Sequence, residues 1–129
     1  MRTVRLTWPG GEHTFRLRIG ELRALQGATD SGPEELFNRI RLANWRVDDL
    51  IQIIRWGLVG GGEMDASKAA TFVTPLFDLH PLSEFRMTAT AILAKTLLAI
   101  EDDPLGEEEG VTETPPGNGA SPSSTELQP

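Results

Sequence analysis

Cysteine is absent from this chain of 129 residues. Without thiols the sequence can form neither a disulfide framework nor a thiolate metal site, and a reducing compartment is its natural setting. The first residues alternate polar with apolar side chains and lack the apolar core of a signal peptide. No later apolar run is long enough to span a bilayer. We therefore expect a cytoplasmic protein without a membrane partner.

Basic residues are missing from the last part of the chain. Residues 1–100 contain all 12 Lys and Arg together with 11 Asp and Glu, whereas residues 101–129 contain 8 acidic residues and no basic one. That last segment is rich in Pro, Gly, Ser and Thr and has few large apolar side chains. The sequence therefore predicts a compact domain over 1–100 and a disordered acidic tail over 101–129. Because an acidic tail repels phosphates and the remainder has no clustered basic face, we expect no nucleic-acid partner.

The first twenty residues have the alternation of a β-hairpin, with a turn over 9–12. The apolar residues at alternate positions are Val4, Leu6 and Trp8 before the turn and Phe15, Leu17 and Ile19 after it. Two strands alone are marginally stable in water, so this apolar face needs a cover of helices.

Helical spacing of apolar residues indicates about five further segments. They are a short turn over 21–26 that stops at Gly27, a helix opening at Pro33, a helix over 47–58 that ends at Gly60, a helix capped by Asp65 and kinked or divided by Pro75, and a helix from Pro81 to Ile100. The predicted fold class is α+β, with an N-terminal β-hairpin packed against a bundle of about four to five helices.

Residues that could support catalysis are few. His13 and His80 lie far apart, and neither has metal-ligating neighbours at a useful spacing. The glycine-rich segment 57–62 follows a predicted helix, whereas a phosphate-binding loop precedes one, so helix termination explains it better. Asp48 and Asp49 diverge by about 100 degrees around a helix and are expected to cap it. We therefore expect no enzyme activity, no catalytic residues, no cofactor and no metal.

Five residues are the candidates for partner contacts. Arg5, Arg16 and Arg18 share the outer face of the predicted hairpin, where they either form an ordinary solvated face or bind an acidic partner or this chain's own tail. Trp45 and Trp56 flank the third helix. A tryptophan is more often part of the core, but Trp45 lies in a loop and is the first candidate for a contact residue.

Three segments together resemble a known family of small tail proteins. They are Leu17-Arg18-Ile19-Gly20-Glu21-Leu22-Arg23-Ala24-Leu25, Asp48-Asp49-Leu50-Ile51-Gln52-Ile53-Ile54 and Gly57-Leu58-Val59-Gly60-Gly61-Gly62. The family belongs to gene transfer agents of α-proteobacteria and related long-tailed phages, and the resemblance covers about residues 3–100. Pro75 and the acidic tail depart from the family's pattern.

The resemblance implies a protein of tail assembly, described either as a tail tube protein or as a tail assembly chaperone. A tube subunit needs a multi-stranded sheet that continues into its neighbours, while strand-like alternation is limited here to the first twenty residues. This favours a chaperone that binds the tape measure protein and assists polymerisation of the tail tube protein. The alternative is a structural subunit, of the tube or the terminator, that is retained in the particle. An enzyme or enzyme regulator of another kind is a second alternative.

A chaperone of this kind needs an exposed apolar groove that accepts amphipathic helices. We expect that groove between the third and the last helix. We also expect the acidic tail to contribute solubility, and weak homo-oligomerisation stays open.

Overall fold

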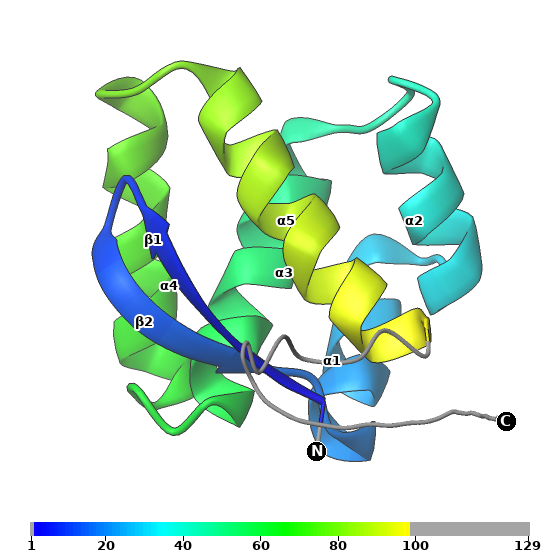
Figure 1. Cartoon of the computed structure of the whole chain (residues 1–129), viewed down its shortest axis with the longest axis horizontal. Coiled ribbons are helices and arrows are strands. Elements are labelled where there is room, and N and C mark those ends of the chain that lie inside the picture. The colour runs from blue at the N-terminus through cyan, green and yellow to red at the C-terminus, as the bar shows by residue number, and fades with distance from the viewer. Residues whose placement is uncertain (1, 99–129) are drawn as a thin grey trace, which may run out of the picture. The chain divides into compact units, whose positions relative to one another are not determined.

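The computed structural model describes residues 2–98, which form one hairpin and a set of helices (Figure 1). The elements are β1 (Thr3–Trp8), β2 (Gly11–Arg16), α1 (Ile19–Thr29), α2 (Pro33–Arg41), α3 (Val47–Gly60), α4 (Ala66–Val73), the 3-10 helix η1 (Thr74–Asp78) and α5 (Leu82–Leu97). The predicted α+β fold, an N-terminal hairpin followed by a helical bundle, is confirmed. The predicted disordered tail, 101–129, lies outside the described residues.

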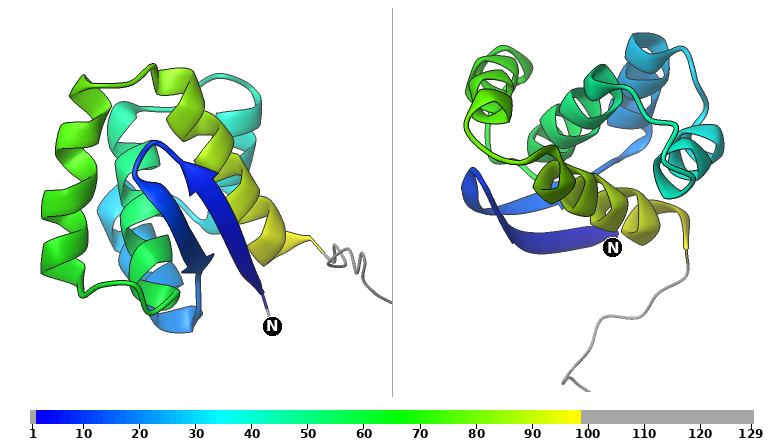
Figure 2. Two further views of the ribbon diagram at one scale, coloured as in Figure 1. Left: turned by 60° about the vertical axis from the view of Figure 1, so that its left-hand side comes forward. Right: turned by 90° about the horizontal axis from the view of Figure 1, so that it is seen from above.

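The hairpin forms as the alternation predicts, and its apolar face packs on helices (Figure 2). β1 and β2 are antiparallel, with Val4 opposite Phe15 and Leu6 opposite His13. Period-two alternation therefore places these side chains on one face together with Trp8. α3 contacts β2 and α5 contacts β1. Trp8 is buried and Phe15 is fully buried under these helices.

The end of the second strand differs from the prediction. The alternation of apolar residues predicted a strand that continues to Ile19. In the structure β2 ends at Arg16, and Ile19 is the first residue of α1 and is 64% exposed. The cause is a capping box, in which Glu21 Oε1 accepts the backbone N–H of Arg18 at 2.9 Å and turns the chain into a helix. The predicted stop at Gly27 is also wrong. α1 continues to Thr29 and ends at Asp30, which has the left-handed conformation (φ 55°).

α3 is the central element, in contact with α1, β2, α4 and α5. Its apolar residues recur at helical spacing, and Leu50, Ile53, Ile54 and Leu58 are fully buried. Such a helix gains its stability from packing on several neighbours more than from intrinsic propensity. The prediction of a helix over 47–58 that ends at Gly60 is confirmed.

The glycines at the end of α3 lie against the edge of β2. A side chain on Gly60 would collide with the carbonyl oxygen of Arg16, and one on Gly61 with that of Thr14. In addition, Thr14 donates its backbone N–H to Glu63 Oε2 at 2.7 Å. Helix termination therefore explains only part of the glycine-rich segment. The outer edge of β2 is covered by the end of α3, and only glycine permits this approach.

The C-terminal helices begin where predicted, but α5 ends at Leu97, before the predicted end at Ile100. Asp65 caps α4 by accepting the backbone N–H of Lys68 at 2.8 Å. Pro75 lies inside η1, which separates α4 from α5, so the predicted division is confirmed. Pro81 is the N-cap of α5, whose buried residues include Phe85, Ile92 and Leu93.

Candidate protein-binding surface

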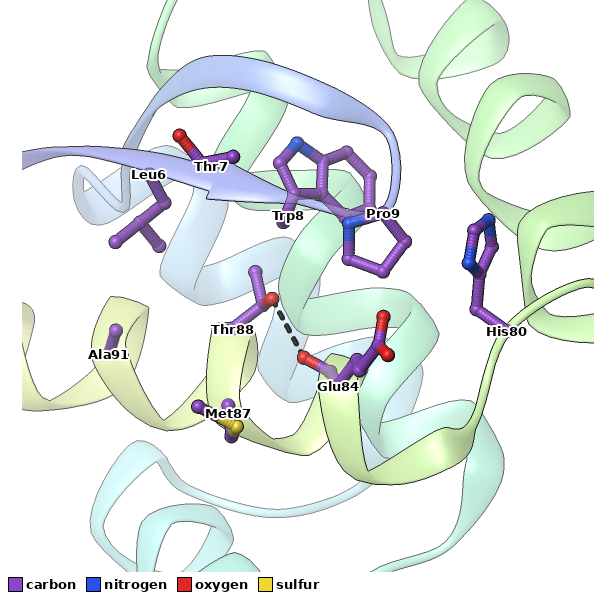
Figure 3. Close-up of a pocket in the computed structure, with 9 residues that line it drawn as sticks. All are labelled: Leu6, Thr7, Trp8, Pro9, His80, Glu84, Met87, Thr88 and Ala91. Atoms are coloured by element: carbon purple, nitrogen blue, oxygen red, sulfur yellow. Dashed lines mark hydrogen bonds between the residues drawn. The ribbon is translucent and has the colours of Figure 1, made fainter.

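An apolar groove lies between β1 and α5 (Figure 3). The hairpin supplies Leu6, Trp8 and Pro9, and α5 supplies Glu84, Met87 and Ala91. The groove has a volume of about 490 Å³. The residues from α5 are three and four positions apart, so they share one face of the helix. Met87 is 72% exposed, which leaves a large flexible apolar side chain at the rim of the groove.

Trp8 forms the fixed wall of this groove. Its ring packs edge-on against Phe15, Phe72 and Phe85, with centroids 5.7, 6.2 and 6.4 Å away. Its Nε1–H donates to His13 Nδ1 at 2.9 Å, an arrangement that needs the neutral imidazole with its proton on Nε2. His13 thus holds the tryptophan in place, and its imidazole is already occupied by a structural contact.

A second hollow lies next to the first one along α5, where α5 borders the end of α2. Its volume is about 720 Å³, and it shares Met87 and Ala91 with the first groove. Arg86 borders it and donates to the carbonyl oxygen of Ile40 at 3.3 Å, at the C-terminal end of α2. Met87 therefore forms a ridge between two hollows, which both lie along the exposed face of α5.

The prediction of an open groove between the third and the last helix is wrong. α3 and α5 contact each other directly, and the side chains on their facing sides are fully buried. Gly57 of α3, for example, lies against Phe15 and Ile92. The apolar stripes that suggested an open groove are buried in the core. The open surface lies on the opposite side of α5.

Trp45 and Trp56 lie outside both hollows. Trp45 is in the loop before α3, as predicted, and is half-buried against the core. Trp56 donates its Nε1–H to Gln52 Oε1 at 3.1 Å, and the Arg55 guanidinium lies 4.7 Å from its ring centre. Their role as partner contacts stays a prediction.

The three predicted arginines do not form a common basic face. Arg5 is paired with Glu12 at 3.2 Å and lies 3.8 Å from Glu63. Arg16 donates from Nε to the carbonyl oxygen of Gly60 at 3.1 Å. Arg18 lies beyond the end of β2, because the chain has turned into α1 by that point. The outer face of the hairpin therefore carries acids beside its arginines, and binding of a partner there stays a prediction.

Arg18 and Glu21 form an ion pair at the start of α1. Glu21 is buried, and its Oε2 lies 2.8 Å from Arg18 Nη2. The hydrogen bond from the Arg18 side chain lowers the pKa of Glu21, with help from the Arg18 backbone N–H, while burial opposes the shift. The same contact raises the pKa of Arg18. The ionised carboxylate is thus favoured in the folded state.

This shift predicts a dependence of stability on pH. A carboxyl group whose folded pKa is depressed stabilises the fold above its unfolded pKa, near about 4.3, and this contribution is lost as pH falls through the folded pKa. We expect Glu21→Gln to reduce the loss of stability between pH 6 and pH 3, measured by urea unfolding. The matched control is Glu12→Gln, in an exposed ion pair, which should leave the pH dependence as in the wild type. Equal pH profiles for wild type and Glu21→Gln would contradict the assignment.

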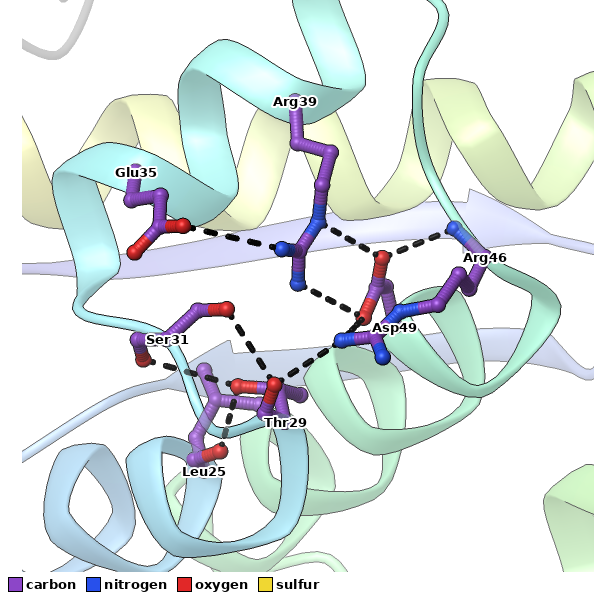
Figure 4. A network of polar contacts seen from close by, with 7 residues as sticks. All are labelled: Leu25, Thr29, Ser31, Glu35, Arg39, Arg46 and Asp49. Atoms are coloured by element: carbon purple, nitrogen blue, oxygen red, sulfur yellow. Dashed lines mark hydrogen bonds and ion pairs between the residues drawn. The ribbon is translucent and has the colours of Figure 1, made fainter.

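Asp49 joins α2 to α3 through a buried ion pair (Figure 4). Its carboxylate accepts the Nε and Nη2 hydrogens of Arg39, each at 3.1 Å, and the backbone N–H of Arg46 at 2.8 Å. The predicted capping role of Asp49 is confirmed. The contact with Arg39 was not predicted. The sequence did contain a signal for it. Arg39 near the end of α2 and Asp49 near the start of α3 have opposite charges, and only a short loop connects these two helix ends.

Residues 2–98 contain no group of three or more His, Asp or Glu side chains that could hold a metal ion. None of their helices is long and apolar enough to cross a membrane.

Comparison with known proteins agrees with the resemblance seen in the sequence. The family model described as phage tail tube protein, GTA-gp10, matches residues 2–99, which is most of the chain. No curated protein and no solved structure matches. The family description fits the structural alternative better than the chaperone interpretation. The chain belongs to the phage tail tube protein family GTA-gp10, and it is a protein of phage or gene transfer agent tails.

Proposed function

We propose that this tail protein acts as an assembly chaperone, which binds another tail protein through the exposed face of α5 and the groove beside it. The tape measure protein and the tail tube protein are the partners we expect. The observation that carries the proposal is the hairpin. Within residues 2–98 the sheet has two strands, and the outer edge of β2 is covered by the end of α3. We also propose that the protein has no enzyme activity.

The covered edge matters because of how subunits join into a ring. A ring held together by strand pairing uses two different open edges on every subunit, since each copy contacts one neighbour on each side. The described domain offers one open edge. In contrast, its α5 face exposes Met87 between two hollows, which suits a temporary contact with an apolar segment of another protein.

The second candidate is a structural subunit of the tail, and the family description supports it. The two candidates differ in the composition of finished particles. A chaperone should be absent from purified particles, whereas a tube subunit should be present in many copies. Quantitative mass spectrometry of purified particles separates them, and stoichiometric amounts of this chain would exclude the chaperone proposal.

A variant of the α5 face tests the proposed surface. We expect Met87→Glu to weaken binding of co-expressed tape measure protein by roughly tenfold or more, because a charge would enter the apolar contact. Folding should be unaffected, since Met87 is 72% exposed. The control is Ile19→Glu, at an apolar residue of α1 that is 64% exposed and borders neither hollow. Equal loss of soluble tape measure protein with both variants would argue against the α5 face.

A further inference from the structure

The two outer edges of the hairpin differ in their free hydrogen-bonding groups. Thr14 points its backbone N–H away from β1, toward Glu63. Arg5 and Thr14 are therefore a non-hydrogen-bonded pair. Such pairs alternate with hydrogen-bonded pairs along an antiparallel ladder. It follows that Thr3, Arg5 and Thr7 direct their backbone N–H and C=O groups away from β2.

These groups of β1 are unsatisfied by the described part of the protein. No hydrogen bond within residues 2–98 uses the backbone of Thr3, Arg5 or Thr7 on that outer side. Arg5 and Thr7 are exposed. A row of donors and acceptors at every second residue is the template on which another strand pairs. β1 is thus the open edge of the sheet.

The apolar groove runs beside this open edge (Figure 3). Leu6 points from β1 toward Ala91 of α5, and Met87 lies on the same helix face. At one end the carboxylate of Glu84 points toward Pro9 and His80. Glu84 is exposed and makes no ion pair with any residue of 2–98. The groove therefore combines unpaired backbone groups, an apolar lining and one carboxylate that has no ion-pair partner within residues 2–98.

We infer that an extended segment of a partner tail protein adds to β1 as a third strand, with alternate apolar side chains in the groove and a Lys or Arg beside Glu84. This inference rests on the proposed function and specifies how the partner is held. Main-chain hydrogen bonds provide affinity in this mode, while the pockets for alternate side chains provide specificity. A helix would leave the edge unpaired, because it satisfies its backbone groups internally.

A second copy of this chain fits the edge less well. Two β1 strands paired antiparallel about Arg5 place the two Arg5 side chains directly opposite each other, and like charges in that position are destabilising. A foreign strand with an uncharged residue opposite Arg5 avoids this repulsion.

Proline at position 7 tests strand addition. The N–H of Thr7 does not take part in the hairpin ladder, so Thr7→Pro removes an outward donor and leaves the pairing with β2 intact. With co-expressed tape measure and tail tube proteins as probes, we expect Thr7→Pro to weaken binding by roughly tenfold or more, while Thr7→Val binds as the wild type. Glu84→Lys should also weaken binding. Unchanged binding of Thr7→Pro would overturn the inference and leave the proposed function standing.

Amide hydrogen exchange of the wild-type full chain gives an answer independent of any variant. Exchange at Arg5 and Thr7 should slow by roughly tenfold or more in the complex, because these amides become bonded. Binding without this protection would overturn strand addition. If neither tail protein binds, the proposed function fails. Hydrogen exchange of the chain alone, at low and high concentration, then shows whether β1 pairs with another strand. If the amides of Arg5 and Thr7 are protected only when the chain itself is concentrated, a second copy occupies the edge and the inference is overturned. If their exchange slows under none of these conditions, no strand adds to β1 and the inference is overturned as well.

Discussion

Replacement of Gly60 by alanine is expected to destabilise the domain by about 3 kcal/mol, because the new methyl group would overlap the carbonyl oxygen of Arg16. The oxygen cannot move aside easily, since it belongs to a strand that is paired with β1 and packed on the core. Gly61→Ala should behave in the same way, through Thr14. Domains of this size are stable by about 5–15 kcal/mol, so either change removes a large share of the total.

The matched control is Gly27→Ala in α1, where a methyl group would meet nothing within 4 Å. Alanine is the better helix former, so this variant should gain about 0.5–1 kcal/mol. Chemical denaturation of the three variants measures the difference. A loss below about 1 kcal/mol in Gly60→Ala would show that β2 and the end of α3 can separate at little cost, and that this edge of the sheet is not firmly closed.

Removal of the Arg39 side chain is expected to cost about 3 kcal/mol, because it leaves the fully buried carboxylate of Asp49 with only the longer ion pair to Arg46 at 3.4 Å. The backbone N–H and the exposed guanidinium of Arg46 would remain as donors, but they do not replace the bidentate guanidinium of Arg39. The measurement is the free energy of unfolding of Arg39→Ala. The double variant Arg39→Met with Asp49→Leu should be more stable than Arg39→Ala, since it removes both charges together.

Arg41→Ala is the matched control for Arg39. Arg41 is in the same helix, is exposed and forms no ion pair with any residue of 2–98. Its removal should change stability by less than about 0.5 kcal/mol. If both alanine variants lose similar stability, the contact between α2 and α3 does not depend on the buried charge pair.

Local patterns in the sequence predicted the elements well because local physics determines them. The hairpin follows from alternation, the start of α4 from the capping residue Asp65, and the end of α4 from Pro75. The same reasoning failed at Ile19, where alternation continued by chance past the end of the strand. The hydrogen bonds between Arg18 and Glu21 decided that boundary, and a pattern of apolar residues does not include them.

The surface was harder to predict than the elements, because it depends on contacts distant along the chain. An apolar stripe on α3 or α5 shows that a face is buried, but does not say which neighbour covers it. The approach of Gly60 to Arg16 and the pair of Arg39 with Asp49 have the same character, since each joins residues of different elements. Met87 illustrates the difficulty most directly. It is an apolar residue of the last helix, yet it is 72% exposed at the rim of the groove.

The position of α5 at the end of the domain affects how the chain folds during its synthesis. β1 leaves the ribosome before every other described element, but α5, which contacts it, is the last of the described helices. At roughly 5–20 residues per second, the apolar side of the hairpin stays uncovered for several seconds of translation. During that interval the nascent chain can bind other proteins through side chains that the finished domain buries. Release of the last helix from the ribosome ends this interval.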